Sequence, residues 1–150
     1  MTTGCCLTEH LCLTPEETET QGENLARILK PGSVVALRGG LGAGKTCFVK
    51  GIARGLGIPE CITSPTYTII CEYRTENNIP FYHMDVYRLN GDEGFESTGA
   101  LELMNGNGIT VIEWSERIQN SIPSDAIIVE IEIAETNCRI IRVNNVTILL

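Results

Sequence analysis

Eight consecutive residues, GGLGAGKT from Gly39 to Thr46, match the pattern G-x-x-x-x-G-K-[ST] of a phosphate-binding P-loop. Glycines let such a loop adopt positive φ and let its backbone approach a ligand closely. Successive backbone N–H groups are then expected to converge on an anion. Lys45 is expected to bridge the β- and γ-phosphates of a nucleotide, and the Thr46 hydroxyl is expected to ligate Mg²⁺. The residues expected to form the cradle are Leu41, Gly42, Ala43, Gly44, Lys45 and Thr46.

Two acidic residues are candidates to complete this chemistry. Glu113 directly follows the apolar run 109–112, a position typical of an acid that a buried strand delivers to Mg²⁺. The alternative is a surface acid at a strand end. Asp85 lies near the end of another apolar segment, where it could order Mg²⁺ waters or the attacking water; an N-cap or turn residue is the alternative. Lys45, Asp85 and Glu113 are therefore the expected catalytic residues.

Three further residues are weaker candidates. Thr66 lies in the segment SPTYT, which is typical of a loop entering a strand, and it could approach the γ-phosphate as switch-loop threonines do. Trp114 could stack on a base or shield the site, although a single tryptophan is more often part of a core. His83 is interpreted as a packed histidine rather than a ligand. Because no NKxD motif is present, we expect adenine rather than guanine nucleotide, with ATP and Mg²⁺ as cofactors.

The residues around the P-loop predict the elements that must position it. The apolar run 34–37 before the loop is typical of a buried strand. After the loop, Phe48, Val49 and Ile52 recur at helical spacing, and the glycines at 55 and 57 end that helix. Upstream, Thr14 and Glu17 have the spacing of a capping box around Pro15, which predicts a helix that ends near 30–32.

The remaining segments alternate between strand and helix patterns. Alternation predicts strands over 66–73 and 80–86, paired as a hairpin-like unit. A glycine-interrupted helix is predicted over 91–103. Segments 127–133 and 139–143 alternate and predict an antiparallel hairpin. A short edge strand is predicted over 11–13, and 144–150 is either a final strand or a tail.

Together these elements predict one α/β domain spanning residues 1–150. Strands alternate with helices early in the chain and hairpins appear late, which favours a P-loop NTPase-like mixed sheet with flanking helices and a C-terminal antiparallel hairpin. In such sheets ligands bind at the carboxyl ends of the strands. The P-loop is expected at that edge.

Composition restricts the class of protein. The chain has 150 residues, a formal net charge of −8 and a sequence pI of about 4.7. This charge argues against autonomous binding of nucleic acid. No apolar run approaches transmembrane length and no signal-peptide pattern is present, so we expect a cytoplasmic protein that does not contact a membrane. The seven cysteines show no metal-binding spacing and are expected to be reduced. Cys47, next to Thr46, is either redox-sensitive or a packed helix residue.

The order of the motifs resembles a known family. GGLGAGKT, CFVKGIARGLG, SPTYT, HMDVYRL and VIEW occur in this order between Gly39 and Trp114. This combination resembles the TsaE (YjeE) family of small bacterial P-loop ATPases, which are needed for threonylcarbamoyl-adenosine (t6A) modification of tRNA. The N-terminal helix and the acidic terminal hairpin also fit, so the resemblance covers nearly the whole chain.

The resemblance implies roles for particular residues. Lys45 and Thr46 would contact phosphates and Mg²⁺, Glu113 would be the second protein ligand of Mg²⁺, and Asp85 would be needed for ATP hydrolysis. Thr66 would lie in a switch-like loop. The resemblance also implies TsaD-like and TsaB-like partners, with transfer to tRNA carried out by the TsaD-like protein. This chain would drive or reset that complex and would reach tRNA only indirectly.

The chain also departs from the family pattern. Gly40 replaces the aspartate of GDLGAGKT, which should loosen the loop, and Cys47 replaces a threonine hydroxyl. The segment 90–103 is richer in glycine than the usual acidic helix.

Two other function classes remain as alternatives. A small-molecule kinase would usually carry an arginine-bearing lid, and no arginine-rich insertion is present. A non-hydrolysing nucleotide-dependent interaction module would not need both Asp85 and Glu113.

Overall fold

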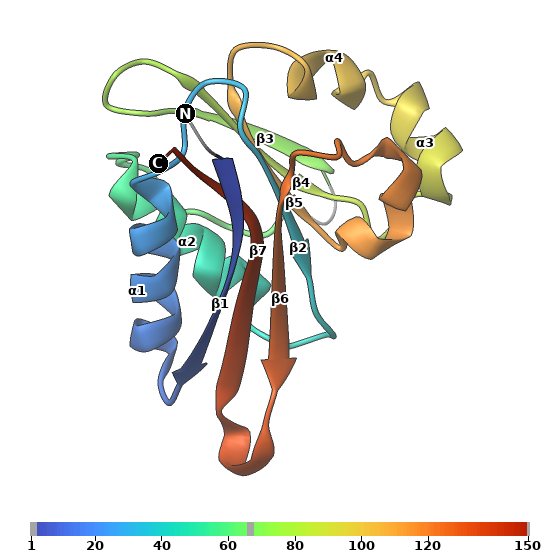
Figure 1. Ribbon diagram of the computed structural model, residues 1–150. Helices are drawn as coiled ribbons and strands as arrows, with labels where there is room; N and C mark the ends of the chain where they lie inside the picture. The colour runs from blue at the N-terminus through green and yellow to red at the C-terminus, as the bar shows by residue number, and fades with distance from the viewer. Residues whose placement is uncertain (1–2, 66–67, 150) are drawn as a thin grey trace.

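A seven-stranded mixed sheet forms the centre of the computed structural model, with helices on both faces (Figure 1). The structure describes residues 3–65 and 68–149, and the side chains of 8–65 and 68–144. The strand order across the sheet is β1-β7-β6-β2-β5-β4-β3. The strands are β1 (Thr3–Cys12), β2 (Val34–Arg38), β3 (Ile70–Arg74), β4 (Pro80–Asp85), β5 (Ile109–Glu113), β6 (Ile127–Ile133) and β7 (Arg139–Leu149). The helices are α1 (Pro15–Ala26), α2 (Lys45–Gly55), α3 (Gly91–Ser97) and α4 (Ala100–Met104), with 3₁₀ segments η1 (Ser115–Ser121) and η2 (Glu135–Asn137).

The central strands are parallel and the outer strands are antiparallel. β2 pairs in parallel with both β5 and β6, and β5 pairs in parallel with β4. β3 is antiparallel to β4, whereas β7 lies antiparallel between β6 and β1. β5 is buried along its whole length because helices cover both of its faces. The predicted mixed α/β sheet with a C-terminal antiparallel hairpin is confirmed.

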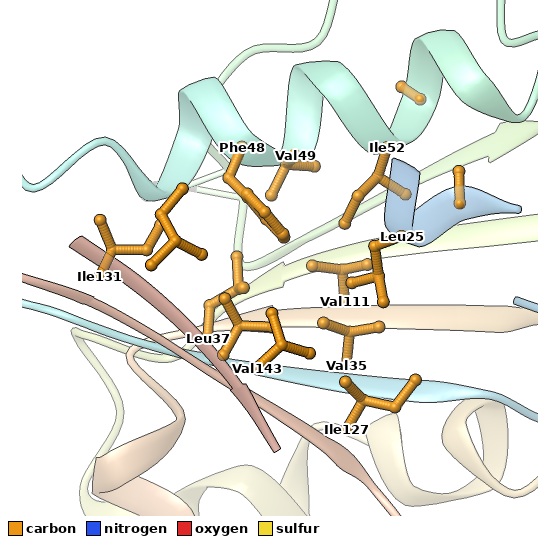
Figure 2. Packing of buried hydrophobic residues seen from close by; sticks show 14 of the residues in the cluster. Leu25, Val35, Leu37, Phe48, Val49, Ile52, Val111, Ile127, Ile131 and Val143 are labelled. Atoms are coloured by element: carbon orange, nitrogen blue, oxygen red, sulfur yellow. The ribbon is translucent and has the colours of Figure 1, made fainter. Parts of the chain in front are cut away.

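Helices α1 and α2 cover one face of the sheet. Figure 2 shows Phe48, Val49 and Ile52 of α2 pointing toward side chains of the sheet, among them Val35 and Val111. The two helices approach closely, because a Cβ added at Gly51 would lie 1.9 Å from the Glu19 carbonyl oxygen. A second buried cluster, around Phe95 and Ile112, fills the other face beneath α3, α4 and η1.

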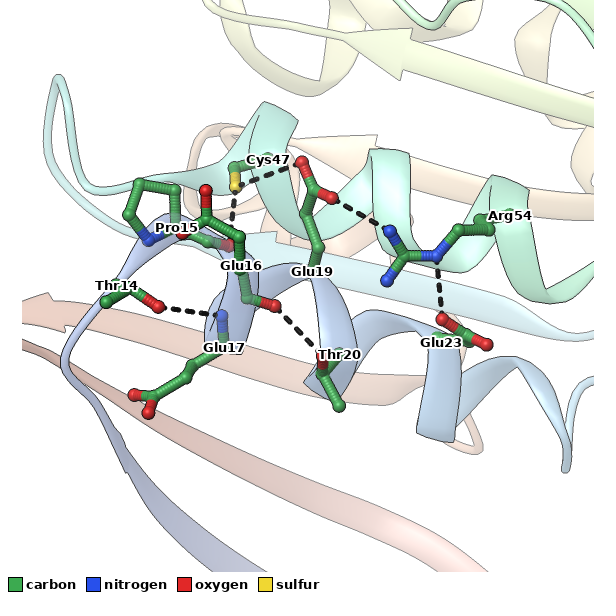
Figure 3. Close-up of polar contacts among 9 residues, drawn as sticks. All are labelled: Thr14, Pro15, Glu16, Glu17, Glu19, Thr20, Glu23, Cys47 and Arg54. Carbon is green, nitrogen blue, oxygen red and sulfur yellow. Dashed lines mark hydrogen bonds and ion pairs between the residues drawn. The ribbon is translucent and has the colours of Figure 1, made fainter.

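The start of α1 agrees with the predicted cap, with one difference. The Thr14 hydroxyl accepts a hydrogen bond from the Glu17 N–H at 3.2 Å (Figure 3). The Glu17 carboxylate accepts from the Leu13 N–H instead of the Thr14 N–H of a standard capping box. The helix ends at Ala26, before the predicted stop at 30–32. Arg54 of α2 bonds Glu19 and Glu23 of α1, which joins the two helices on their exposed side (Figure 3).

Two predicted elements begin or end elsewhere. The strand predicted over 66–73 is described only from Ile70 to Arg74, because Ile69 has φ 69° and interrupts the extended backbone. The glycine-interrupted helix predicted over 91–103 is confirmed: Gly99, with φ 78°, separates α3 from α4, and α4 ends at Met104. The predicted pairing of 66–73 with 80–86 is confirmed by the antiparallel register of β3 and β4.

The edge formed by β1 and β7 is longer than the sequence predicts. The edge strand predicted over 11–13 runs from Thr3 to Cys12, with an irregularity between Cys6 and Thr8. Segment 144–149 continues β7 as a strand. Within the described part of the chain, we find no helix with the length and apolar character needed to cross a membrane.

Candidate functional site

The P-loop connects β2 to α2 at the carboxyl edge of the parallel strands. Gly42 and Gly44 have φ values of 77° and 102°, which side-chain-bearing residues adopt at a cost. Gly44 precedes the first residue of α2, so the loop ends at a helix N-terminus, where backbone N–H groups favour an anion. A cavity of about 300 Å³ opens there. It is lined by Leu41, Gly42, Ala43, Gly44, Lys45, Thr46, Cys47, Ser64, Asp85, Glu113 and Trp114.

Lys45 lies almost buried in this cavity, with 5% of its surface exposed. Its ammonium donates to the carbonyl oxygens of Gly39 at 2.6 Å and Gly40 at 2.9 Å. Its Nζ atom also lies 3.8 Å from the centre of the Trp114 ring. Burial lowers the pKa of Lys45, whereas the carboxylates of Glu113, Glu116 and Asp85 oppose that change. The buried cation therefore lies beside the P-loop backbone in the cavity, and its contact with phosphate stays a prediction.

The two predicted Mg²⁺ ligands lie side by side. The Thr46 hydroxyl is 3.1 Å from each carboxylate oxygen of Glu113. Both side chains supply hard oxygen atoms, which Mg²⁺ prefers. Among the described residues there is no group of three or more His, Cys, Asp or Glu side chains that could hold a metal. A site with few protein oxygens fits Mg²⁺, which usually keeps several waters and takes phosphate oxygens as ligands.

His83 contacts the predicted metal ligand directly. Its ring is fully buried, and Nε2 lies 2.5 Å from Glu113 Oε2. β4 and β5 are parallel neighbours, with Asp85 opposite Glu113, and this pairing brings the histidine ring to the carboxylate. The interpretation of His83 as packed holds, but its contact with Glu113 was not predicted. The alternation of His83 with Asp85 on one strand face could have indicated that His83 lies near the site.

Asp85 makes the turn contact that the sequence offered as one alternative, and its side chain also lines the cavity. Its Oδ1 accepts from the Tyr87 N–H at 2.9 Å, which is a local turn contact. Its Oδ2 faces Ser64, whose hydroxyl donates at 3.4 Å, and the side chain lines the cavity. The Asp85 N–H also donates to the Ile69 carbonyl at 2.9 Å. Asp85 therefore contacts both ends of the segment 64–69, at Ser64 and at Ile69.

Trp114 lies at the cavity rather than in the sheet core. Its backbone is left-handed, with φ 63°. The centre of its ring lies 4.7 Å from that of Tyr87, with the two rings tilted at 49°, and the ring faces Lys45. It therefore covers the lysine from one side. Predicted Thr66 lies outside the described residues.

Two residues that contact the P-loop were missed by sequence reasoning. Glu116 Oε2 accepts from the Gly39 N–H at 3.4 Å, and Arg139 donates to the carbonyls of Gly42 and Ala43. No local pattern in the sequence marks either of them.

Cys47 is a packed thiol. Its Sγ donates to the Pro15 carbonyl at 3.3 Å and lies 3.9 Å from a Glu19 carboxylate oxygen (Figure 3). Burial, and then the Glu19 charge, raise the pKa of the thiol. A raised pKa disfavours the reactive thiolate, so the structure favours packing between α1 and α2 over redox sensitivity.

Known proteins resemble this chain in sequence and fold. The profile of the family described as "Threonylcarbamoyl adenosine biosynthesis protein TsaE" matches residues 12–141. A Treponema pallidum protein named "tRNA threonylcarbamoyladenosine biosynthesis protein TsaE" is 47% identical over 118 residues, covering 79% of this chain and 86% of that protein. An Aquifex aeolicus protein of the same name is 39% identical over 139 residues, covering 91% and 96%.

A solved structure agrees with these matches. The crystal structure of YdiB from Bacillus subtilis has a TM-score of 0.78 and 35% sequence identity, and the match covers 94% of this chain and 86% of that one. The family match extends from Cys12 at the end of β1 to Ile141 in β7, and so includes every described residue of the cavity. With its P-loop, its paired Thr46 and Glu113, and these similarities, the chain belongs to the TsaE family.

Proposed function

We propose that this protein binds and hydrolyses ATP with Mg²⁺, in support of threonylcarbamoyl-adenosine modification of tRNA. The observation that carries the proposal is the convergence of Lys45, Thr46 and Glu113 in one cavity at a helix N-terminus. The names of the relatives, which describe tRNA threonylcarbamoyladenosine biosynthesis, supply the process.

Different groups of the cavity would bind the phosphates and the metal ion. Backbone N–H groups from Leu41 to Thr46 would hold the phosphates, and the Lys45 ammonium would neutralise the β- and γ-phosphate oxygens. The Thr46 hydroxyl and the Glu113 carboxylate would hold Mg²⁺, which supplies neutralisation of charge that develops on the phosphate oxygens. His83, through Nε2, keeps the Glu113 carboxylate turned toward Thr46. Burial of these groups strengthens their electrostatic interactions, because water screens them less.

Asp85 would act on the attacking water. Its Oδ1 accepts from the Tyr87 N–H and its Oδ2 accepts from the Ser64 hydroxyl, so both contacts fix the orientation of a carboxylate that lines the cavity. An oriented carboxylate oxygen can accept a hydrogen bond from water and align it with the terminal phosphate. We assign this positioning role to Asp85.

The 64–69 loop would report the nucleotide state to partners. Asp85 contacts this loop at Ser64 and at Ile69, and predicted Thr66 lies between them in the sequence. A γ-phosphate contact at Thr66 would change the same segment, as in other switch loops. TsaD-like and TsaB-like proteins are the proposed partners in the cytoplasm, and they would bring the tRNA.

Steady-state hydrolysis of ATP tests this proposal. We expect slow turnover by the protein alone and faster turnover with a TsaB/TsaD-like pair. A gel shift of tRNA with the isolated chain is expected to show no tight binding at physiological salt, because a net charge of −8 repels the phosphate backbone. Turnover indifferent to the partners, or tight tRNA binding by the chain alone, would overturn the proposal.

A further inference from the structure

Arg139 reaches from the C-terminal hairpin to the outer side of the P-loop. Its Nε–H donates to the Ala43 carbonyl at 2.9 Å, and Nη2 donates to the Gly42 carbonyl at 3.1 Å. Its Nη1 donates to the Asn137 carbonyl at 2.9 Å, which anchors the side chain to its own turn. One guanidinium thus joins the loop between β2 and α2 to the turn between β6 and β7.

The hairpin fixes the position of this arginine. Thr136 and Asn137 have φ values of 60° and 63°, and the Ala134 N–H donates to the Cys138 carbonyl at 2.8 Å to close the turn. Arg139 is the first residue of β7, opposite Ile133 of β6. Residues two apart on a strand share a face, so Arg139 is on the same face as Ile141, which is buried in the cluster beneath α1 and α2.

The contacts of Arg139 set the direction of two peptide groups. A trans peptide is planar, so its C=O and the following N–H point to opposite sides. Holding the Ala43 carbonyl toward Arg139 therefore turns the Gly44 N–H away from the guanidinium. Gly42 and Gly44, which flank Ala43, both have positive φ and the wide conformational freedom of glycine. A charged donor on the outer carbonyls restricts that freedom more strongly than a neutral one would.

We propose that Arg139 is a positioning residue for the P-loop: it holds the Gly42 and Ala43 carbonyls outward so that the loop stays shaped to receive a polyphosphate. The role rests on the proposed nucleotide binding, but it concerns the loop and not the nucleoside. Through Arg139, the C-terminal hairpin would shape the P-loop, although the two segments lie far apart in the sequence.

The test compares two arginines of the same strand. Arg142 is three residues further along, on the opposite face, where it pairs with Glu9 and Glu132. We expect Arg139→Ala to weaken binding of ATP by about tenfold or more, since charge-assisted hydrogen bonds to two carbonyls are lost. Arg142→Ala is expected to bind as the wild type does. Arg139→Lys, which retains the charge without the planar fork, is expected to lie between them. Circular dichroism and thermal unfolding establish that each variant is folded.

Inorganic tripolyphosphate separates loop positioning from contact with the base or sugar. If Arg139 acts through the P-loop, the alanine variant loses the same factor in affinity for tripolyphosphate as for ATP. A loss confined to ATP would overturn the inference in favour of a direct nucleoside contact. Equal affinities in Arg139→Ala and wild type would overturn it as well. Absence of ATP binding by the wild type would instead contradict the proposed function, and this inference with it.

Free guanidinium ion supplies a third readout. At concentrations far below those that unfold proteins, guanidinium chloride is expected to restore part of the affinity of folded Arg139→Ala for tripolyphosphate, whereas sodium chloride at equal ionic strength is not. Identical responses to the two salts would contradict a specific role of the guanidinium group.

Discussion

At the scale of single residues, Glu113 is the centre of the site. Its carboxylate contacts the Thr46 hydroxyl on one side and the His83 ring on the other, and only 3% of its surface is exposed. A carboxylate this buried is stabilised by its hydrogen bonds. The same contacts leave it directed at the hydroxyl that a P-loop uses to hold Mg²⁺.

We expect Glu113→Gln to weaken nucleotide binding at least about tenfold in the presence of Mg²⁺, and much less in its absence, because the amide removes a charged metal ligand. Calorimetric titration of ATP with Mg²⁺ and with EDTA measures both affinities. Glu116→Gln serves as the control, since Glu116 also carries a negative charge near Lys45 but bonds the Gly39 N–H, and it should change both affinities by the same factor. Equal weakening by Glu113→Gln under both conditions would count against the metal role.

The residues predicted from sequence are those whose position in the chain reveals their place in the sheet. Lys45 and Thr46 lie in a motif, and Asp85 and Glu113 end parallel strands that meet at one edge. The contacts of Arg139 were not predictable, because it is separated from Gly42 by 97 positions. Such a contact depends on the strand order, which the sequence pattern did not provide.

At the scale of the elements, the packing of α1 on α2 supports the start of the P-loop helix. Glycine at position 51 permits this packing, because the Glu19 backbone of α1 occupies the place of a Cβ. Polar contacts from Arg54 to Glu19 and Glu23 add to it at the surface, where ion pairs contribute little. The close packing of the two helix backbones at Gly51 is therefore a stronger link than these ion pairs.

Forcing a Cβ into this contact in Gly51→Ala is expected to cost about 2–3 kcal/mol, the upper part of the usual range for overpacking, because a backbone oxygen occupies its place. Alanine gains roughly 1 kcal/mol over glycine within a helix, so we expect a net destabilisation of about 1–2 kcal/mol. Urea unfolding monitored by circular dichroism measures it. Gly94→Ala in α3, whose added Cβ would have no neighbour nearer than 3.5 Å, should not destabilise the fold. A Gly51→Ala variant as stable as the wild type would contradict the packing described here.

Helices and strands with long apolar periodicity were predicted from the sequence. Element ends were less predictable where a residue has positive φ. The strands β2, β4 and β5 and the helix α2 were anticipated from apolar runs and spacing. Ile69, with φ 69°, delayed the start of β3, whereas the interruption at Gly99 agrees with the glycine-interrupted helix predicted over 91–103. Pairing with β7 extended β1 far beyond the three predicted residues, because tertiary hydrogen bonds can recruit segments of weak strand preference.

At the scale of the whole molecule, the residues of the candidate site lie at one edge of the sheet. The P-loop, Asp85 and Glu113 come from segments spread over half of the chain, and the parallel register of β2, β5 and β4 brings them together. The antiparallel hairpin at the other side of β2 reaches the same loop through Arg139. The acidic balance of the chain disfavours binding of free nucleic acid, so we expect its role in tRNA modification to depend on a partner that binds the RNA.

Binding of ATP in the cavity at the P-loop can be measured directly by equilibrium titration of Lys45→Ala with Mg²⁺–ATP. Lys45 is the buried cation of this cavity, whereas Lys50, on the same helix, is exposed and does not line it. We predict that folded Lys45→Ala loses ATP binding by at least about a hundredfold, since it removes a desolvated charge paired with phosphate, and that Lys50→Ala binds as the wild type does. Wild-type affinity in a folded Lys45→Ala protein would contradict binding of ATP at this P-loop.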